Sequence, residues 1–167
     1  PYSLDVPGGV QSHVLDLARA LIALGHAVSV LAPADDERPP GAPALPAFVT
    51  PAGRAVSVPY NGSVARVTFG PVSYARVRRW LADHTFDVLH LHEPGTFSLS
   101  SLALFEGEGP IVATFHTSTE RSRAIAAFAR PINALMEKVT ARIAVSPMAR
   151  RVQVRYLGGD AVEIPNG

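Results

Sequence analysis

The sequence of 167 residues contains no cysteine. Without a thiol the chain can form no disulfide bond, no thiolate metal site and no cysteine nucleophile, as is common in proteins of a reducing compartment. It also lacks any apolar run near the 18 or so residues that a membrane-spanning helix needs, and any signal-peptide pattern. The apolar fraction of 47% and the charged fraction of 17% are those of a folded globular chain. We therefore expect one cytoplasmic α/β domain with its own core.

Acidic residues are missing from a long internal segment. Residues 38–82 contain no Asp or Glu, although about four would be expected from the 14 acids in 167 residues. The same segment holds six arginines, at positions 38, 54, 66, 76, 78 and 79. Three of them, with Trp80, lie on a predicted amphipathic helix that suits an anionic membrane surface. A solvated helix face is the plain alternative, and nucleic acid is disfavoured because no aromatic stacking platform accompanies the charges.

The hydrophobic periodicity predicts alternating helices and strands. The expected helices cover residues 10–24, 73–83, 97–106, 121–142 (with a kink at Pro131) and 147–157. The expected strands cover residues 27–32, the region of Phe48, 54–59, 64–69, 86–91, 110–115, 143–145 and 161–164. This alternation predicts a Rossmann-like, mostly parallel sheet with helices on both faces. Because the glycine loop at Gly8 and Gly9 has no strand before it and residue 1 is not methionine, we expect the first strand to be missing.

Polar residues follow several of the predicted strands. In such a sheet, ligands gather where parallel strands end, and there we place the Gly8–Gly9 loop, His90 to Glu93, His116 to Ser118, and Ser146. His116 is the candidate for polar catalysis, with a turn-capping histidine as the alternative. His90, His92 and His116 resemble a three-histidine metal set, but strand histidines usually bond to neighbouring groups, so no metal is expected. Glu93 is either a general base or a carboxylate at a helix entry.

Five segments together resemble a known family: residues 1–14, Val58 to Arg66, Asp87 to Pro94, Ala113 to Ser118 and Val162 to Gly167. They are similar to family-four retaining glycosyltransferases, and among these to the actinobacterial enzymes that mannosylate phosphatidylinositol. The resemblance implies one half of a two-domain GT-B fold. Residues 1–167 would be the N-terminal, acceptor-binding domain, truncated at both ends and without the C-terminal nucleotide-sugar domain.

The resemblance also assigns roles to individual residues. It implies His116 as the catalytic residue and Gly8 and Gly9 at the donor. It implies contact with the acceptor for Tyr2, Asp5, Gln11, Tyr60, Asn61, Ser63, Arg66 and Arg121, and membrane docking for Arg76, Arg78, Arg79 and Trp80. No cofactor or structural metal is implied; GDP-mannose is the donor substrate.

The function expected from this resemblance is transfer of mannose from GDP-mannose to an inositol hydroxyl of phosphatidylinositol, with retention. The enzyme would be peripheral at the inner face of the cell membrane, and this fragment alone would be inactive. Alternatives are a related transferase with another acceptor, and an isolated module that binds anionic lipid or acceptor.

Overall fold

The computed structural model describes residues 2–35, 44–60, 63–117 and 132–166. The helices in these ranges are α1 (Gly9–Ala23), α2 (Pro71–Ala82), α3 (Leu99–Glu106) and α5 (Pro147–Leu157), with a further helical turn at 132–136. The strands are β1 (Val30–Ala32), β2 (Val49–Pro51), β3 (Val56–Tyr60), β4 (Ser63–Val67), β5 (Leu89–His92), β6 (Ile111–Phe115), β7 (Ala141–Ala144) and β8 (Val162–Glu163).

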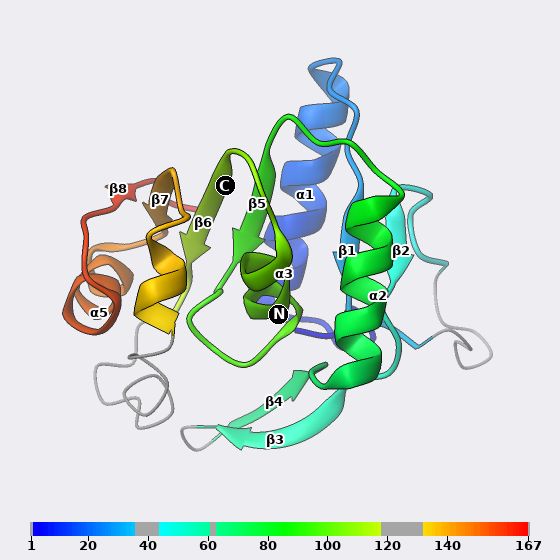
Figure 1. The fold of residues 1–167 in the computed structure, drawn as a ribbon, viewed down its shortest axis with the longest axis horizontal. Helices are drawn as coiled ribbons and strands as arrows, with labels where there is room; N and C mark the ends of the chain where they lie inside the picture. Colours follow the sequence, from blue (N-terminus) through cyan, green and yellow to red (C-terminus); the bar gives the residue numbers. More distant parts are fainter. Residues whose placement is uncertain (1, 36–43, 61–62, 118–131, 167) are drawn as a thin grey trace.

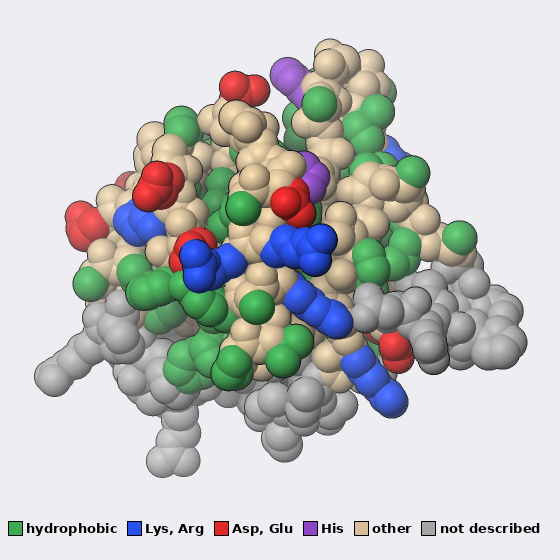
Figure 2. All heavy atoms as spheres, turned by 45° about the vertical axis from the view of Figure 1, so that its right-hand side comes forward, with side chains coloured by type: hydrophobic (Ala, Val, Ile, Leu, Met, Phe, Trp, Pro, Cys, Tyr) green, Lys and Arg blue, Asp and Glu red, His purple; other side chains and the backbone are tan. Residues whose placement is uncertain are grey.

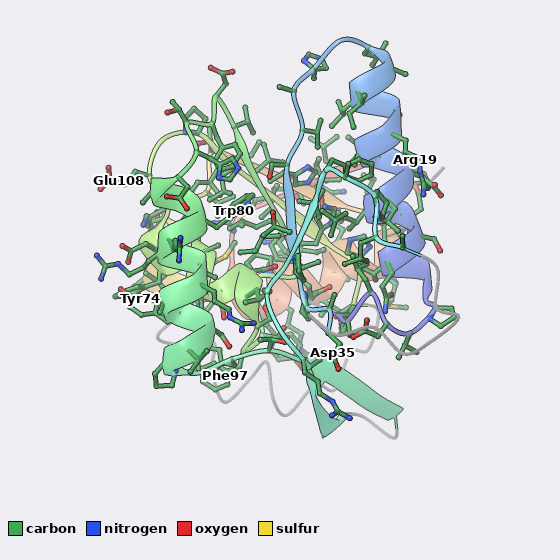
Figure 3. All side chains as sticks on the ribbon, turned by 90° about the vertical axis from the view of Figure 1, so that its right-hand side faces the viewer. Arg19, Asp35, Tyr74, Trp80, Phe97 and Glu108 are labelled. Atoms are coloured by element: carbon green, nitrogen blue, oxygen red, sulfur yellow. The ribbon has the colours of Figure 1, made fainter. Side chains whose placement is uncertain are left out.

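Parallel strands form the centre of the molecule. β5, β6, β7 and β8 pair in that order in one parallel sheet, and β1 pairs in parallel with β2 beside it (Figure 1). Viewed from the side, the strands lie between α1 on one face and α2 on the other (Figure 3). This confirms the predicted Rossmann-like α/β fold with helices on both faces.

The buried faces of β5 and β6 carry the core. Leu89, Leu91, Ile111, Ala113 and Phe115 are all buried. Strands covered by helices on both sides must be apolar along nearly their whole length, which is why these segments are recognisable as short continuous apolar runs.

Helix ends follow local chemistry. α1 ends where Gly25 adopts φ +92, its N–H donating to the carbonyl of Ile22 while the N–H of His26 donates to that of Leu21. These two bonds are the Schellman arrangement, which favours glycine because only glycine adopts positive φ without strain. α5 begins at Pro147, as predicted, and Ser146 caps it by accepting a hydrogen bond from the N–H of Ala149 at 3.1 Å.

The predicted helix over 121–142 is wrong at its end. The helical turn stops at residue 136, and 141–142 already belong to β7. Thr140 and Arg142 separate from the helix because the backbone N–H of Thr140 donates to the carbonyl of Ile111, pairing this segment with β6. Pro131 and the start of that helix lie outside the described residues.

Trp80 corrects the expected membrane-facing surface. Its side chain is only 9% exposed, packs on Phe86 with ring centroids 4.6 Å apart, and donates from Nε1 to Ser29 Oγ at 3.3 Å. In Figure 3 it points from α2 toward the strands. Trp80 therefore fixes α2 to the core, and it is unavailable to a membrane in this arrangement.

Candidate functional site

The N-terminal loop lies at the end of β1. The backbone N–H of Leu4 donates to the carbonyl of Pro33 at 2.8 Å, and that of Asp35 donates to Asp5 Oδ2 at 2.9 Å. Asp5 Oδ2 also accepts a hydrogen bond from the hydroxyl of Ser3 at 3.0 Å. The loop that precedes α1 is thereby fixed at the carboxyl edge of the parallel strands, where ligands of such sheets bind.

Gln11 closes this loop onto α1. Its Nε2 donates to the carbonyl oxygens of Ser3 at 3.1 Å and Val6 at 3.2 Å. The residues predicted to contact the acceptor, Asp5 and Gln11, thus both hold the loop together. That structural role does not test the predicted contact, which stays a prediction together with that of Tyr2.

The two glycines of the loop differ in their surroundings. A Cβ on Gly8, the residue that caps α1, would lie 2.4 Å from Gln11 Oε1, whereas a Cβ on Gly9 would meet nothing within 4 Å. Gly8 is therefore needed for the close approach of Gln11, and Gly9 leaves the first turn of α1 uncovered. The free amides of that turn suit an anionic group, because they lie at the positive end of the helix dipole.

Three histidines from three elements meet beside this helix. His92 ends β5, His116 follows β6, and His13 lies in the second turn of α1. His92 Nδ1 and His116 Nε2 are 3.0 Å apart, and the ring of His13 lies 5.7 Å from that of His92 and 5.4 Å from that of His116, centroid to centroid. His13 is not among the residues predicted from the sequence, although it lies three residues after Val10 and four before Leu17, on the apolar stripe of the helix.

The same surroundings keep these imidazoles neutral. Burial, reinforced by the neighbouring histidines, lowers the pKa of His116 to about 4 and the pKa of His92 well below its usual value. Burial also lowers the pKa of His13, against the raising effect of Asp16. At neutral pH each ring therefore offers one N–H donor and one lone pair.

His116 keeps one ring nitrogen for another partner. Its Nδ1 is buried and has no hydrogen-bond partner among the described residues. If His92 donates to His116 Nε2, then Nδ1 carries the proton and is a donor; in the opposite tautomer Nδ1 is an acceptor. In either form the ring can bind a ligand hydroxyl or oxygen.

Glu93 fixes the backbone on which His116 stands. Its carboxylate Oε2 accepts hydrogen bonds from the backbone N–H groups of His116 at 2.8 Å and Thr117 at 2.9 Å. The side chain is 2% exposed, and burial raises the pKa of Glu93 while those hydrogen bonds oppose the rise. Glu93 therefore has neither of the roles considered from the sequence, general base or carboxylate at a helix entry. Its carboxylate binds backbone N–H groups of a loop, and the residue that caps the next helix, α3, is Ser98.

His90 lies next to the three histidines and contacts Thr114 and His92. Its Nε2 lies 2.7 Å from Thr114 Oγ1, and its ring stacks on that of His92 with centroids 4.5 Å apart. Burial lowers the pKa of His90 to about 4. The metal set considered from sequence is therefore wrong in one member, because His13 occupies the place given to His90.

The remaining predicted acceptor residues lie on or near a hairpin. β3 and β4 pair antiparallel with Tyr60 opposite Ser63, so the strands expected over 54–59 and 64–69 form a hairpin. Arg66 stands on β4, opposite Ser57. Asn61 and Arg121 lie outside the described residues. The predicted contacts of all these side chains stay predictions.

The arginines of α2 differ in their surroundings. Arg78 Nε lies 3.0 Å from Glu106 Oε1 of α3, and Arg79 Nε lies 3.5 Å from Asp83 Oδ2. Arg76 instead lies over the backbone of Gly53. The charge of the acid-free segment is thus partly balanced by acids from outside it. Figure 2 shows cationic side chains in a row on this face, with hydrophobic side chains beside them.

An apolar patch adjoins the same helix. We define it as Phe69, Val72 and Phe97, which are all exposed, with the two phenylalanine rings 4.7 Å apart. Phe97 lies near the beginning of α2 in Figure 3.

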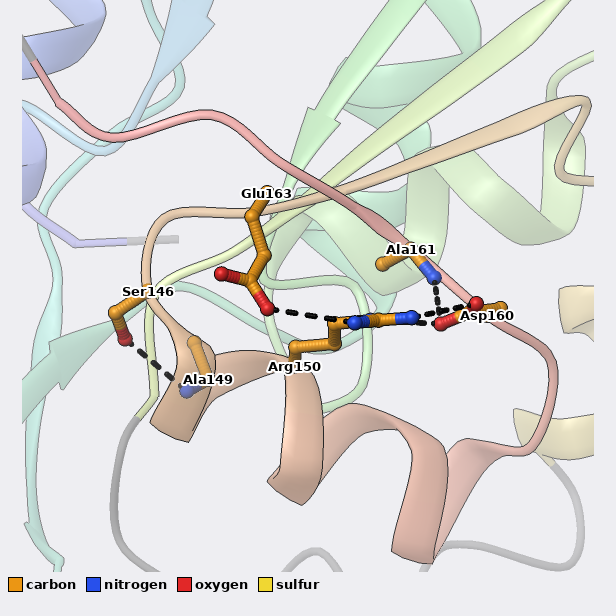
Figure 4. Close-up of polar contacts among 6 residues, drawn as sticks. All are labelled: Ser146, Ala149, Arg150, Asp160, Ala161 and Glu163. Atoms are coloured by element: carbon orange, nitrogen blue, oxygen red, sulfur yellow. Dashed lines mark hydrogen bonds and ion pairs between the residues drawn. The ribbon is translucent and has the colours of Figure 1, made fainter.

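A separate hollow of about 630 Å³ lies against α5, lined in part by Arg150, Arg155 and Asp160. Arg150 pairs with Asp160 at 2.7 Å and with Glu163 at 3.5 Å, joining α5 to β8 (Figure 4). The hydrogen bonds from Arg150 lower the pKa of Asp160 to about 2. None of the three histidines lines this hollow, so it is distinct from the histidine site.

A Rossmann-like domain with a glycine loop, a helix start and a buried histidine at its carboxyl edge is typical of one half of a nucleotide-sugar transferase. The sequence profile of Glycosyltransferase Family 4 matches residues 7–167, so the chain belongs to this family. Its fold is accordingly that of a GT-B N-terminal domain.

The chain is also similar to proteins named phosphatidyl-myo-inositol mannosyltransferase. It is 59% identical over 167 residues to that of Mycobacterium tuberculosis (strain H37Rv) and 58% identical to that of Mycobacterium leprae, covering all of this chain and 43% of each relative. It is 43% identical over 169 residues to that of Propionibacterium freudenreichii, covering 44% of it. The chain thus spans less than half the length of these relatives. None of its described helices is long and apolar enough to cross a membrane.

Proposed function

We propose that the protein carrying this chain transfers mannose from GDP-mannose to an inositol hydroxyl of phosphatidylinositol, with retention, at the inner surface of the cell membrane. The observation that carries this proposal is the identity of 59% across the whole chain to a phosphatidyl-myo-inositol mannosyltransferase. In the proposal, residues 1–167 supply the acceptor half of the site.

His116 is the catalytic side chain in this half. Its neutral ring is held by Glu93 through the backbone and by His92 through Nε2, which leaves Nδ1 for a sugar or inositol hydroxyl. A positioned polar group of this kind stabilises the charge that develops as the sugar leaves its diphosphate, without reorganising during the reaction.

In the proposal, the first turn of α1 binds the donor substrate. Gly9 leaves room for a phosphate or sugar oxygen next to the first helix amides, where partial positive charge favours an anion. By the family resemblance, most nucleotide contacts belong to the C-terminal half of the GT-B fold, whereas this chain spans 43% of the length of its mycobacterial relatives. We therefore expect the isolated chain to have no transfer activity.

The membrane is approached through α2. Arg79 is 85% exposed there, and the apolar patch lies near the beginning of the same helix. Cationic side chains attract anionic lipids over about a Debye length, while exposed apolar side chains gain by entering the interface. In the proposal, α2 brings the acceptor side of the domain against the lipid that carries the inositol.

Two other functions fit part of the same geometry. A related family-four enzyme would use a soluble inositol phosphate, and an isolated binding module would bind lipid without transfer. Neither uses all of the observations, because the first leaves the apolar patch unexplained and the second leaves the buried His116 Nδ1 unexplained.

The test is a transfer assay on the complete protein that carries this chain. GDP-mannose is supplied with vesicles of phosphatidylinositol or with soluble inositol phosphate, and product is measured by mass. We expect product with the vesicles, a fall of about 10²- to 10⁴-fold in kcat for His116→Ala, and unchanged kcat for His26→Ala, an exposed histidine outside the site. Product with the soluble acceptor alone refutes the lipid acceptor, and near-normal turnover of His116→Ala refutes its catalytic role.

A further inference from the structure

Three histidines converge on one point although they are distant in the sequence. His13 comes from α1, His92 from the end of β5 and His116 from the residue after β6. One ring nitrogen from each lies within 4.8 Å of the other two. The proposed transfer chemistry uses His116, with His92 as the partner of its ring, and gives no part to His13.

The distances suit a small transition-metal ion. Zinc binds imidazole nitrogen at about 2.0–2.1 Å in tetrahedral geometry, which places two ligand nitrogens about 3.3 Å apart. The 3.0 Å between His92 Nδ1 and His116 Nε2 is close to that value. His13 needs only a small side-chain movement to complete the set, and it is half-exposed on a helix.

The surroundings also suit ligation. Burial keeps the rings neutral, so that a lone pair is present without loss of a proton, as metal binding requires. His90 stacks on His92 with ring centroids 4.5 Å apart, and His90 Nε2 lies 2.7 Å from Thr114 Oγ1. This packing restricts the movement of the His92 ring.

We propose that His13, His92 and His116 form a site for one zinc-class divalent ion, with the fourth position open to water or a substrate oxygen. The ion is not a cofactor of the transfer. The ion takes the lone pair of His116 Nε2 and so replaces the hydrogen bond to His92 that holds the ring for the acceptor. The site therefore makes the enzyme sensitive to free transition metal.

The experiment measures Zn²⁺ binding to the complete protein by calorimetry in a non-chelating buffer, with Co²⁺ as a spectroscopic probe. We expect one equivalent to bind and Co²⁺ to show the strong visible absorption of four-coordinate geometry. His13→Ala and His116→Ala each weaken Zn²⁺ binding by at least about tenfold, while His26→Ala binds as the wild type does. His92 is left intact because it is buried in the sheet.

Folding is checked separately by the thermal midpoint in EDTA. His13 is half-exposed, so His13→Ala is expected to keep the wild-type midpoint without metal and to lose the rise that Zn²⁺ gives the wild type. Zinc binding by His13→Ala as tight as that of the wild type overturns the proposal, as does the absence of binding to the wild type. Both readouts are independent of transfer activity, so their failure is distinguishable from failure of the proposed function.

Discussion

At the scale of the residue, the backbone around the histidine site depends on one buried carboxylate. Glu93 has φ +53, the only positive value among the described non-glycine residues, and its Oε2 receives two backbone N–H groups. A left-handed φ costs a non-glycine residue about 1 kcal/mol or more, so the carboxylate contacts must offset it. Because those contacts hold His116, Glu93 is a positioning residue.

We predict that Glu93→Ala lowers the free energy of unfolding by about 2–3 kcal/mol, because two buried N–H groups lose their acceptor. Glu93→Gln keeps an oxygen acceptor and removes a costly buried charge, so its stability is expected within about 1 kcal/mol of the wild type. Urea unfolding measures both. In the transfer assay, Glu93→Ala is expected to lower kcat more than it changes KM, and Glu93→Gln is expected to keep most of the wild-type kcat. Equal stability of Glu93→Ala and the wild type contradicts this role.

At the scale of the element, α2 has two faces with different partners. Ser73, Val77 and Trp80 are buried at a spacing of three and four residues, and Arg78 and Arg79 lie outside. The arginines are paired with Glu106 and Asp83, but these exposed pairs hold the side chains only weakly. An anionic surface can therefore replace the acids as their partner.

We predict that Arg79→Glu reduces binding of the complete protein to phosphatidylinositol vesicles several-fold, because charge reversal changes attraction into repulsion. Co-sedimentation at low and moderate salt measures the effect, which diminishes as salt screens it. The matched control is Arg19→Glu on α1, since Arg19 is also exposed and paired with an acid of its own helix, Asp16, at 2.7 Å. If both variants bind equally, α2 is not the docking element.

Periodicity predicted the helices well and their contacts less well. α1, α2, α3 and α5 lie within two residues of expectation at each end, because their apolar stripes and their glycine or proline boundaries are local signals. Trp80 was expected at the membrane because an apolar helix face beside arginines suits a lipid surface as well as a protein core, and the structure packs this face on the core. Its spacing of three from Val77 puts it on the buried face.

Contacts between segments distant in the sequence were harder to predict from the sequence. Parallel topology predicts that His92 and His116 end adjacent strands, and they do. Which helix side chain faces them depends on how α1 packs across the sheet, and single-sequence periodicity does not determine that packing. His13 was missed for this reason, and the contact of Glu93 with the following loop was missed because it depends on an unusual φ.

At the scale of the whole molecule, neutral histidines connect α1 to β5 and to the loop after β6. His13 belongs to α1, while His90 and His92 lie on β5 and contact Thr114 and His116 of the next strand and its loop. Folding therefore withdraws several imidazoles from water. Such groups make stability depend on pH wherever the unfolded chain binds protons that the folded chain does not.

We predict that the protein loses stability as pH falls from about 7 to 5. Burial lowers the pKa of His90 to about 4 in the folded chain, against 6.5 for an ordinary histidine, so in this window the unfolded chain takes up a proton that the folded chain does not. The contribution of His90 to the free energy of unfolding is fully present above pH 6.5 and decreases as the pH falls toward 4. Between pH 7 and pH 5 this decrease amounts to about 2 kcal/mol. The raised pKa of Glu93 acts in the opposite direction, so the measurement compares variants.

Urea unfolding of the wild type and His90→Gln at pH 7 and pH 5, both in EDTA, isolates the histidine contribution. Glutamine keeps a polar partner for Thr114 but does not titrate, and Glu93 is common to both proteins, so its effect cancels in the difference. The wild type is expected to lose about 2 kcal/mol more than His90→Gln over this range. Equal losses would show that His90 is solvated and protonates as readily in the folded chain as in the unfolded one.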